Sequence, residues 1–141
     1  MNRRRSPATA RGIPLLLAAG LLLAGCAPTP SPDPALVALS ADALSATRSA
    51  ELGTGLREDG RMFTTTARAL LGDMEQKLAD ALREAELHRP ADAEDAAYRD
   101  ELIAATLEAL DAVQAAVAEQ PGALDELDAA AEQLEGLEGA P

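Results

Sequence analysis

The sequence predicts an all-α protein, a small helical bundle built on a long antiparallel helix hairpin. After residue 34, apolar side chains recur at alternating spacings of three and four residues, the period of helix faces packed in a bundle. Proline and glycine interrupt this period at intervals and mark helix ends. No segment has the alternating, β-branched pattern of a strand. We therefore expect three long helices and a short C-terminal one.

The first predicted helix runs from Pro34 to about Leu52. Asp33 is a favourable N-cap residue, and proline is favoured at the first helical position because its missing N–H has no helical partner there. One face repeats small and apolar residues, namely Leu36, Leu39, Ala43 and Ala46. Gly53-Thr54-Gly55 and Gly60 are expected to interrupt or bend the chain, since an interior glycine costs up to about 1 kcal/mol relative to alanine.

The second predicted helix spans roughly Asp59 to His88 and is the first arm of the hairpin. Its apolar seam has spacings of 4, 3, 4, 3 and 4 residues, as in a coiled coil. The seam residues are Ala67, Leu71, Met74, Leu78, Ala81 and Ala85. Pro90 ends this helix.

The third predicted helix, the second arm, begins at Asp92 as N-cap, with Asp95 three residues on in a capping-box position. Its seam residues are Ile103, Thr106, Leu110, Val113 and Val117. It stops at Pro121-Gly122. A short fourth helix carries Leu124, Leu127, Ala131 and Leu134. We expect Phe63 and Tyr98, the two aromatic residues, to pack inside this bundle.

The N-terminal quarter of the chain has the composition of an export signal. Four arginines, Arg3, Arg4, Arg5 and Arg11, precede an apolar segment of about a dozen residues, 13–24. A membrane-spanning helix needs about 20 residues, so this segment is too short to be one. The segment ends in Leu23-Ala24, and Gly25-Cys26 follow directly.

Leu23-Ala24-Gly25-Cys26 resembles the lipobox of bacterial lipoproteins. The resemblance implies that signal peptidase recognises Leu23, Ala24 and Gly25, cuts before Cys26, and leaves that cysteine as a lipidated N-terminus with two or three acyl chains. Two chains give stable anchoring, since each buried methylene adds about 0.8 kcal/mol. We therefore expect a protein that is lipid-anchored to the cell membrane on its extracytoplasmic side, at the extracellular face or in the periplasm.

These patterns divide the chain into four parts. Residues 1–25 are the predicted signal peptide, and residues 26–34 are the lipidated cysteine and a proline-rich tether. Proline favours extended polyproline II, so the tether is expected to hold the domain about 20–25 Å from the lipid surface. Residues 35–135 are the predicted helical domain, and residues 136–141 a flexible tail. The single cysteine, Cys26, leaves no partner for an internal disulfide.

Charge excludes several partners. The formal net charge is −12, with 24 acidic and 12 basic residues. Loss of the four signal arginines makes the mature part still more negative, and no Lys or Arg follows Arg99. Nucleic-acid binding depends on clustered cations and has no basis here. Anionic lipid would also repel the domain, so the N-terminal lipid must supply the membrane contact.

No catalytic constellation is apparent. The serines lack the context of a nucleophile elbow, and Cys26 is committed to lipid. The acidic run 92–95 lacks the glycine and the terminal glutamate of an EF-hand loop. The run 125–128 is interpreted as a solvated face, with weak binding of divalent cations as the alternative. Thr64-Thr65-Thr66 is interpreted as ordinary surface. We predict no catalytic residue, no metal ligand and no cofactor.

His88 is the single histidine, which excludes a metal site with two histidines in one chain. The interpretation favoured from the sequence is a cation at a helix end, paired with Glu84 one turn before it. The alternative is a one-histidine ligand or an acid–base group.

The function expected from the sequence is that of a non-enzymatic lipoprotein. Its helical bundle would present an acidic surface to another protein of the cell envelope, or to a second copy of the chain. The alternative is a lipoprotein that binds a small ligand or divalent cation and is associated with a transporter.

Overall fold

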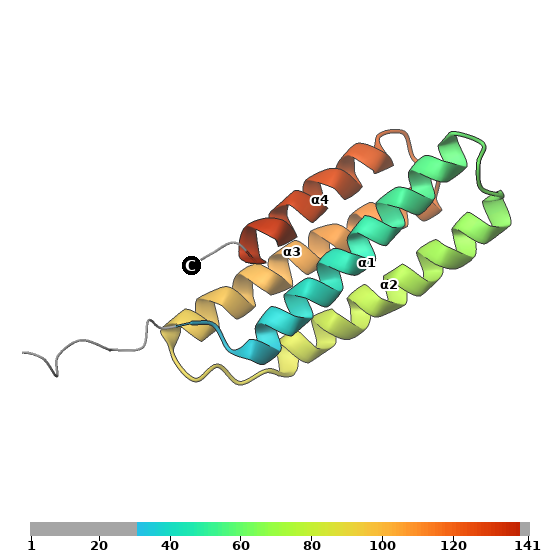
Figure 1. Ribbon diagram of the computed structural model, residues 1–141. Coiled ribbons are helices and arrows are strands. Elements are labelled where there is room, and N and C mark those ends of the chain that lie inside the picture. The colour runs from blue at the N-terminus through green and yellow to red at the C-terminus, as the bar shows by residue number, and fades with distance from the viewer. Residues whose placement is uncertain (1–30, 139–141) are drawn as a thin grey trace, which may run out of the picture. The chain divides into compact units, whose positions relative to one another are not determined.

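The computed structural model describes residues 31–138, which form four α-helices and no strand (Figure 1). The helices are α1 (Pro34–Glu58), α2 (Thr64–Leu87), α3 (Ala93–Val117) and α4 (Ala123–Glu138). Short loops join them, and the chain runs back and forth along the bundle (Figure 1). Each helix packs against the next, α1 packs against α4, and α1 and α3 also touch. The predicted all-α helical bundle is confirmed.

The start of α1 follows the sequence pattern. Asp33 is the N-cap, and its Oδ1 accepts a 2.7 Å hydrogen bond from the amide of Ala35. Pro34 occupies the first helical position, where its fixed φ suits the helix and its missing N–H leaves no unpaired donor. The start of α1 depends on contacts between neighbouring residues, which explains why the sequence alone predicts it.

The predicted interruption of the first helix at Gly53-Thr54-Gly55 is wrong, because α1 continues through these residues to Glu58. Gly53 is buried, and a Cβ at this position would lie 2.6 Å from Cδ2 of Leu70 on α2. The glycine therefore lets α2 approach closely, and this packing outweighs its poor helix propensity. The turn comes at Gly60, whose φ of +67° suits a residue without Cβ.

Helix α2 begins at Thr64, five residues later than the predicted Asp59, because the turn around Gly60 occupies the residues between. Phe63 precedes the helix and is 83% exposed, so the expectation that it packs inside the bundle is wrong. Thr64-Thr65-Thr66 is exposed, as expected. The buried residues of α2 are the six predicted seam residues: Ala67, Leu71, Met74, Leu78, Ala81 and Ala85.

Helix α3 is capped as predicted but turned relative to its predicted seam. Oδ1 of Asp92 accepts hydrogen bonds of 2.9 Å from the amides of Glu94 and Asp95. Of the predicted seam, Thr106 and Val113 are buried. The three remaining members, Ile103, Leu110 and Val117, are only partly buried and flank the core. The central positions are occupied by Leu102 and by alanines, namely Ala105, Ala109, Ala112 and Ala116.

Alanine dominates the core, which explains this difference. Most buried hydrophobic residues are alanines, and the large fully buried side chains are a few leucines and one valine. These large side chains are Leu36, Leu71, Leu78, Leu102, Leu127, Leu134 and Val113. Alanine lets helix axes approach closely and displaces the larger side chains to the flanks of the interface. A seam inferred from large apolar residues is therefore shifted by one position on α3.

Helix α4 is shorter than the others, with 16 residues against 25 in α1. At 1.5 Å per residue it is about 24 Å long, against about 37 Å for α1. It starts beside the turn that follows α3 and stops short of the end where α1 begins (Figure 1). Its last residue is Glu138, beyond the expected domain boundary at residue 135.

Candidate functional site

Three segments of the chain meet where α1 begins, and each contributes a side chain able to bind a metal ion. Asp33 is the N-cap of α1, His88 follows α2, and Asp95 lies in the first turn of α3. One ligand atom from each lies within 4.8 Å of the others. Within residues 31–138 this is the one such group of three or more residues. We call it the aspartate–histidine cluster.

Asp95 is the most buried member of the cluster, 5% exposed. Its Oδ1 accepts a 2.8 Å hydrogen bond from the amide of Asp33, and its Oδ2 accepts one of 3.2 Å from the amide of Ala91. A capping box would instead join this side chain to the amide of the N-cap residue, Asp92. Asp95 therefore bonds the start of α1 and the α2–α3 loop to the first turn of α3.

Asp33 divides its two oxygens between local and distant partners. Oδ1 caps α1 through the amide of Ala35, while Oδ2 lies 3.8 Å from Nε2 of His88. The His88 side chain is 17% exposed, and its Nε2 atom is buried without a hydrogen-bond partner in the part of the chain that the structure describes. A separation of 3.8 Å is too long for a hydrogen bond.

The predicted pairing of His88 with Glu84 is wrong, because within the described residues the carboxylate within 4.0 Å of the His88 ring is that of Asp33. Glu84 instead lines an open groove of about 310 Å³ between α1 and α2. The ionisable residues of this groove are Asp42, Lys77, Asp80 and Glu84. Sequence spacing identifies only neighbours on the same helix, such as Glu84. It does not identify Asp33, which lies 55 positions before His88 in the sequence.

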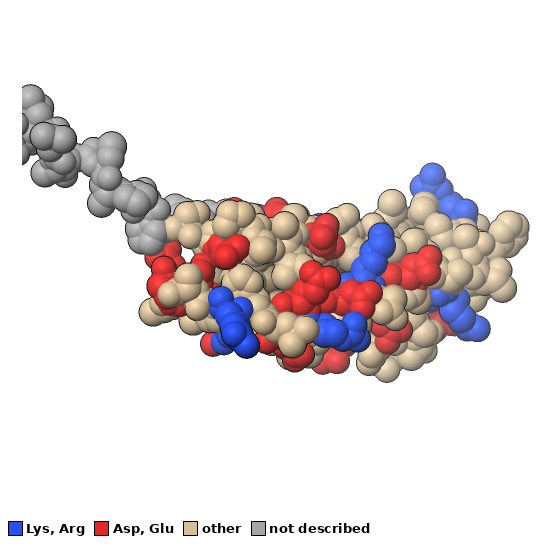
Figure 2. Space-filling view, turned by 90° about the horizontal axis from the view of Figure 1, so that it is seen from below, with Lys and Arg blue, Asp and Glu red and all other residues tan. Residues whose placement is uncertain are grey.

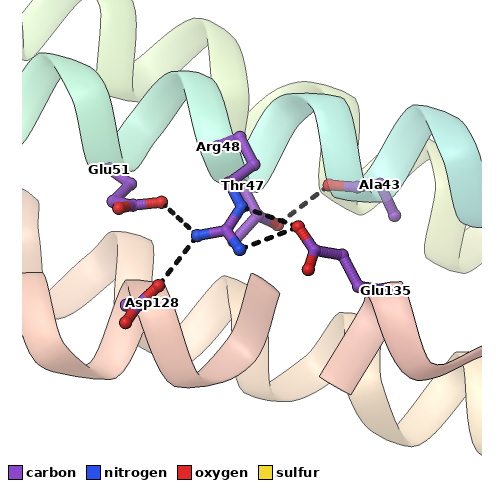
Figure 3. A network of polar contacts seen from close by, with 6 residues as sticks. All are labelled: Ala43, Thr47, Arg48, Glu51, Asp128 and Glu135. Carbon is purple, nitrogen blue, oxygen red and sulfur yellow. Dashed lines mark hydrogen bonds and ion pairs between the residues drawn. The ribbon is translucent and has the colours of Figure 1, made fainter. Parts of the chain in front are cut away.

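A second polar network fastens α4 to α1 (Figure 3). Nη1 of Arg48 donates to Glu51 at 2.7 Å and to Asp128 at 2.8 Å, and Nη2 donates to Glu135 at 2.8 Å. The hydrogen bonds to Glu51, Asp128 and Glu135 raise the pKa of Arg48 above its ordinary value, because each stabilises the charged guanidinium. Arg48 belongs to none of the patterns recognised in the sequence.

The acidic runs have no common role in the structure. In the first run, Asp92 caps α3, Glu94 is exposed and Asp95 belongs to the aspartate–histidine cluster. In the run 125–128, the three carboxylates are exposed and Leu127 is buried. Carboxylates in the first turn of α4 suit the positive end of a helix.

The other expected site residues have separate outcomes. Tyr98 is buried as expected, 6% exposed, and its hydroxyl has no partner among the described residues. Leu23, Ala24, Gly25 and Cys26, on which the lipobox resemblance depends, lie outside the described residues. The aspartate–histidine cluster was missed as a group, because the sequence showed Asp33 only as a helix cap and Asp95 only as part of a capping box.

Comparison with known proteins gives no relative from which a role can be transferred. The chain matches no protein-family model, and no curated protein or solved structure matches it significantly. Among residues 31–138, none of the helices has the length and hydropathy that crossing a bilayer requires.

Proposed function

We propose that the protein is a non-enzymatic lipoprotein, held on the extracytoplasmic side of the cell membrane by lipid on Cys26. The bundle would present an acidic surface to another protein of the cell envelope. The observation that carries the proposal is the order of the parts: arginines and an apolar segment that leads to Leu23-Ala24-Gly25-Cys26, then a proline-rich segment, then a helical domain whose first helix begins at Pro34.

The charge of the bundle supports a partner with a basic surface. All carboxylates from Asp100 onward are exposed, while no Lys or Arg follows Arg99. Figure 2 shows one face of the molecule, on which acidic side chains are spread between fewer basic ones. The same negative charge opposes close contact between two copies of the domain.

The outer side of the α3–α4 pair is the surface we favour for this contact. An open groove of about 240 Å³ lies there, lined by alanines and by Glu108, Asp111 and Glu126. We call these three carboxylates and the groove between them the acidic face. None of the three has an ion-pair partner among the described residues, so their charge is available to a partner. Complementary charge mainly speeds association and selects partners.

The α2–α3 pair is proposed as the antiparallel hairpin on which α1 and α4 pack. The support is the continuous buried seam of α2, in which every predicted position is buried. Within this framework, α3 would carry one half of the acidic face and α4 the other.

Lipid anchoring is tested by detergent phase partitioning and by mass spectrometry of the mature N-terminus. The native chain is expected in the detergent phase, with a diacylglyceryl group on Cys26 as the first residue. Cys26→Ser is expected to stay uncleaved and unlipidated, whereas Ser31→Ala, a control in the tether, is expected to behave as the native chain does. A native protein found in the aqueous phase with residues 1–25 still attached would contradict the proposal.

The partner contact is tested by cross-linking in membranes. Neutralising the acidic face with Glu108→Gln, Asp111→Asn and Glu126→Gln is expected to abolish the cross-linked species. A matched variant with the same change of charge elsewhere, Glu58→Gln, Asp73→Asn and Glu86→Gln, is expected to retain it. Equal loss in both variants would indicate nonspecific charge attraction, and no cross-linked species in the native protein would refute the partner.

Binding of a divalent cation is a second candidate function. The aspartate–histidine cluster favours it over small-ligand binding, because Asp33, His88 and Asp95 offer metal-ligand atoms within 4.8 Å of one another.

A further inference from the structure

The imidazole at the end of α2 has an unexplained geometry. Nε2 of His88 is buried and has no hydrogen-bond partner among residues 31–138, and Oδ2 of Asp33 is 3.8 Å away. A buried polar atom without a partner costs about 1–3 kcal/mol. A hydrogen bond would bring the two atoms to about 2.9 Å. The observed gap suits two ligands on either side of an ion better than it suits a direct contact.

Asp95 is held in place as metal-binding carboxylates are. Two backbone amides, those of Asp33 and Ala91, donate to its two oxygens. Each carboxylate oxygen has a second lone pair that remains free. Hydrogen bonds from outside the ligand set orient ligating carboxylates and contribute to metal affinity. Asp95 is thus a fixed ligand, only 5% exposed, whose oxygens still have lone pairs free for a metal ion.

The three ligand atoms are close enough to be drawn onto one ion. They lie within 4.8 Å of one another, whereas ligands bound tetrahedrally at about 2.0–2.2 Å lie about 3.3–3.6 Å apart. The widest separation must therefore shrink by at most about 1.5 Å on binding. Asp33 can supply much of this movement through its side-chain torsions, because its side chain is 37% exposed and only Oδ1 is used for the cap.

We propose that Asp33, His88 and Asp95 bind one divalent metal ion, with zinc as the best match. Imidazole favours zinc over magnesium and calcium, which prefer sites made entirely of oxygen. Three protein ligands leave a fourth position for water. The nearby Arg99 does not compete for the carboxylates of the cluster, because its guanidinium is turned to Asp100 and to the carbonyl of His88.

The bound ion would fasten three segments that are distant in sequence. It would join the N-cap of α1, the end of α2 and the first turn of α3, at the end of the bundle where α1 begins. The role is structural, and it does not depend on the lipid or on the acidic face. The proposal rests on the second candidate function, cation binding at this cluster, and its outcome is separate from that of the lipid anchor and the acidic face.

The test is calorimetric titration of the purified full chain in detergent, after removal of metals with a chelator. Zinc chloride is the probe, and calcium and magnesium chloride are the comparisons. We expect one zinc ion per chain and a rise in the melting temperature. Preferential binding of calcium or magnesium would overturn the choice of zinc. No heat of binding and no change in melting temperature with any of the three would overturn the site.

Variants assign the ligands. Asp33→Asn retains an N-cap residue, so it tests ligation without losing the helix start, and His88→Ala removes the imidazole. Each is expected to lower zinc affinity at least tenfold, while circular dichroism checks that the helices remain. Glu84→Gln, one turn before His88, is the matched control and is expected to bind zinc as the native chain does. Native affinity in His88→Ala would refute the proposal.

Discussion

The amide of Asp33 donates a 2.8 Å hydrogen bond to Oδ1 of Asp95, a residue 62 positions later in the sequence. Asp33 is at once the cap of α1 and the last residue before the helices begin. Because of this bond, α3 as well as α1 fixes the position of Asp33, where the chain enters the bundle. The same carboxylate accepts from Ala91 in the α2–α3 loop, so one buried side chain organises this end of the molecule.

Replacing Asp95 should therefore destabilise the whole domain. Asp95→Ala leaves the amides of Asp33 and Ala91 without their acceptor, and we expect the free energy of unfolding to fall by about 2–3 kcal/mol. Asp95→Asn keeps one acceptor oxygen and should lose about half as much. Chemical denaturation measures both. Glu101→Ala, an exposed change on the same helix, should stay within about 0.5 kcal/mol of the native chain; an equally mild Asp95→Ala would contradict this account.

The two glycines Gly53 and Gly72 should respond differently to alanine. Gly72 is exposed on α2, and a Cβ added there would have nothing within 4 Å, so Gly72→Ala should stabilise the domain by about 1 kcal/mol. At Gly53 the same gain in helix propensity is offset by a clash, because the new methyl would lie 2.6 Å from Leu70 and force that side chain to move. Thermal unfolding should rank Gly72→Ala above Gly53→Ala, and the reverse order would show that Leu70 adapts freely.

Buried threonines of α1 offer a matched pair. The hydroxyl of Thr47 donates a 2.8 Å hydrogen bond to the carbonyl of Ala43, whereas the hydroxyl of Thr54 is buried and has no partner within residues 31–138. Valine keeps the shape and removes the hydroxyl. We expect Thr54→Val to raise the free energy of unfolding by about 1 kcal/mol, and Thr47→Val to lower it by about 0.5–1 kcal/mol. Denaturation curves with the same sign for both would contradict the difference in hydrogen bonding.

The ion pairs of Arg48 should hold α4 in a salt-dependent manner. Arg48→Met removes the contacts to Asp128 and Glu135, and we expect a lower melting temperature and faster amide exchange in α4. The difference in melting temperature between Arg48→Met and the native chain should be smaller in 1 M salt, where the screening length falls to about 3 Å. Arg61→Met, an exposed change with no ion pair among the described residues, is the control. A deficit that is independent of salt would indicate lost packing instead.

The sequence predicted those parts of the fold that depend on neighbouring residues. The caps at Asp33 and Asp92 are bonds over two or three positions, and the seam of α2 is a regular spacing of three and four residues with large apolar residues flanked by alanines. On α3, large side chains also flank the core, so the size of an apolar residue does not show whether it is buried. The predicted seam was therefore displaced by one position, from Leu102 to Ile103.

The candidate site was hidden because its members come from three segments. The residues next to Asp33 give no sign that the second oxygen of this capping aspartate faces His88. The residues next to Asp95 give no sign that it is buried where α1 begins. Gly53 shows the same difficulty in the fold: a glycine inside a helix predicts a break, and only the position of Leu70 explains why the helix continues.

The shortness of α4 gives the helical bundle a taper. Helix α4 lies beside the other helices near the turn between α1 and α2, but it stops short of the end where α1 begins (Figure 1). Val37 and Leu87, both at this thinner end, keep 39% and 75% of their surface exposed. A mechanical load that enters through the N-terminal segment would act first on the least supported turns, so α1 should peel away stepwise from Asp33 before the thicker end yields.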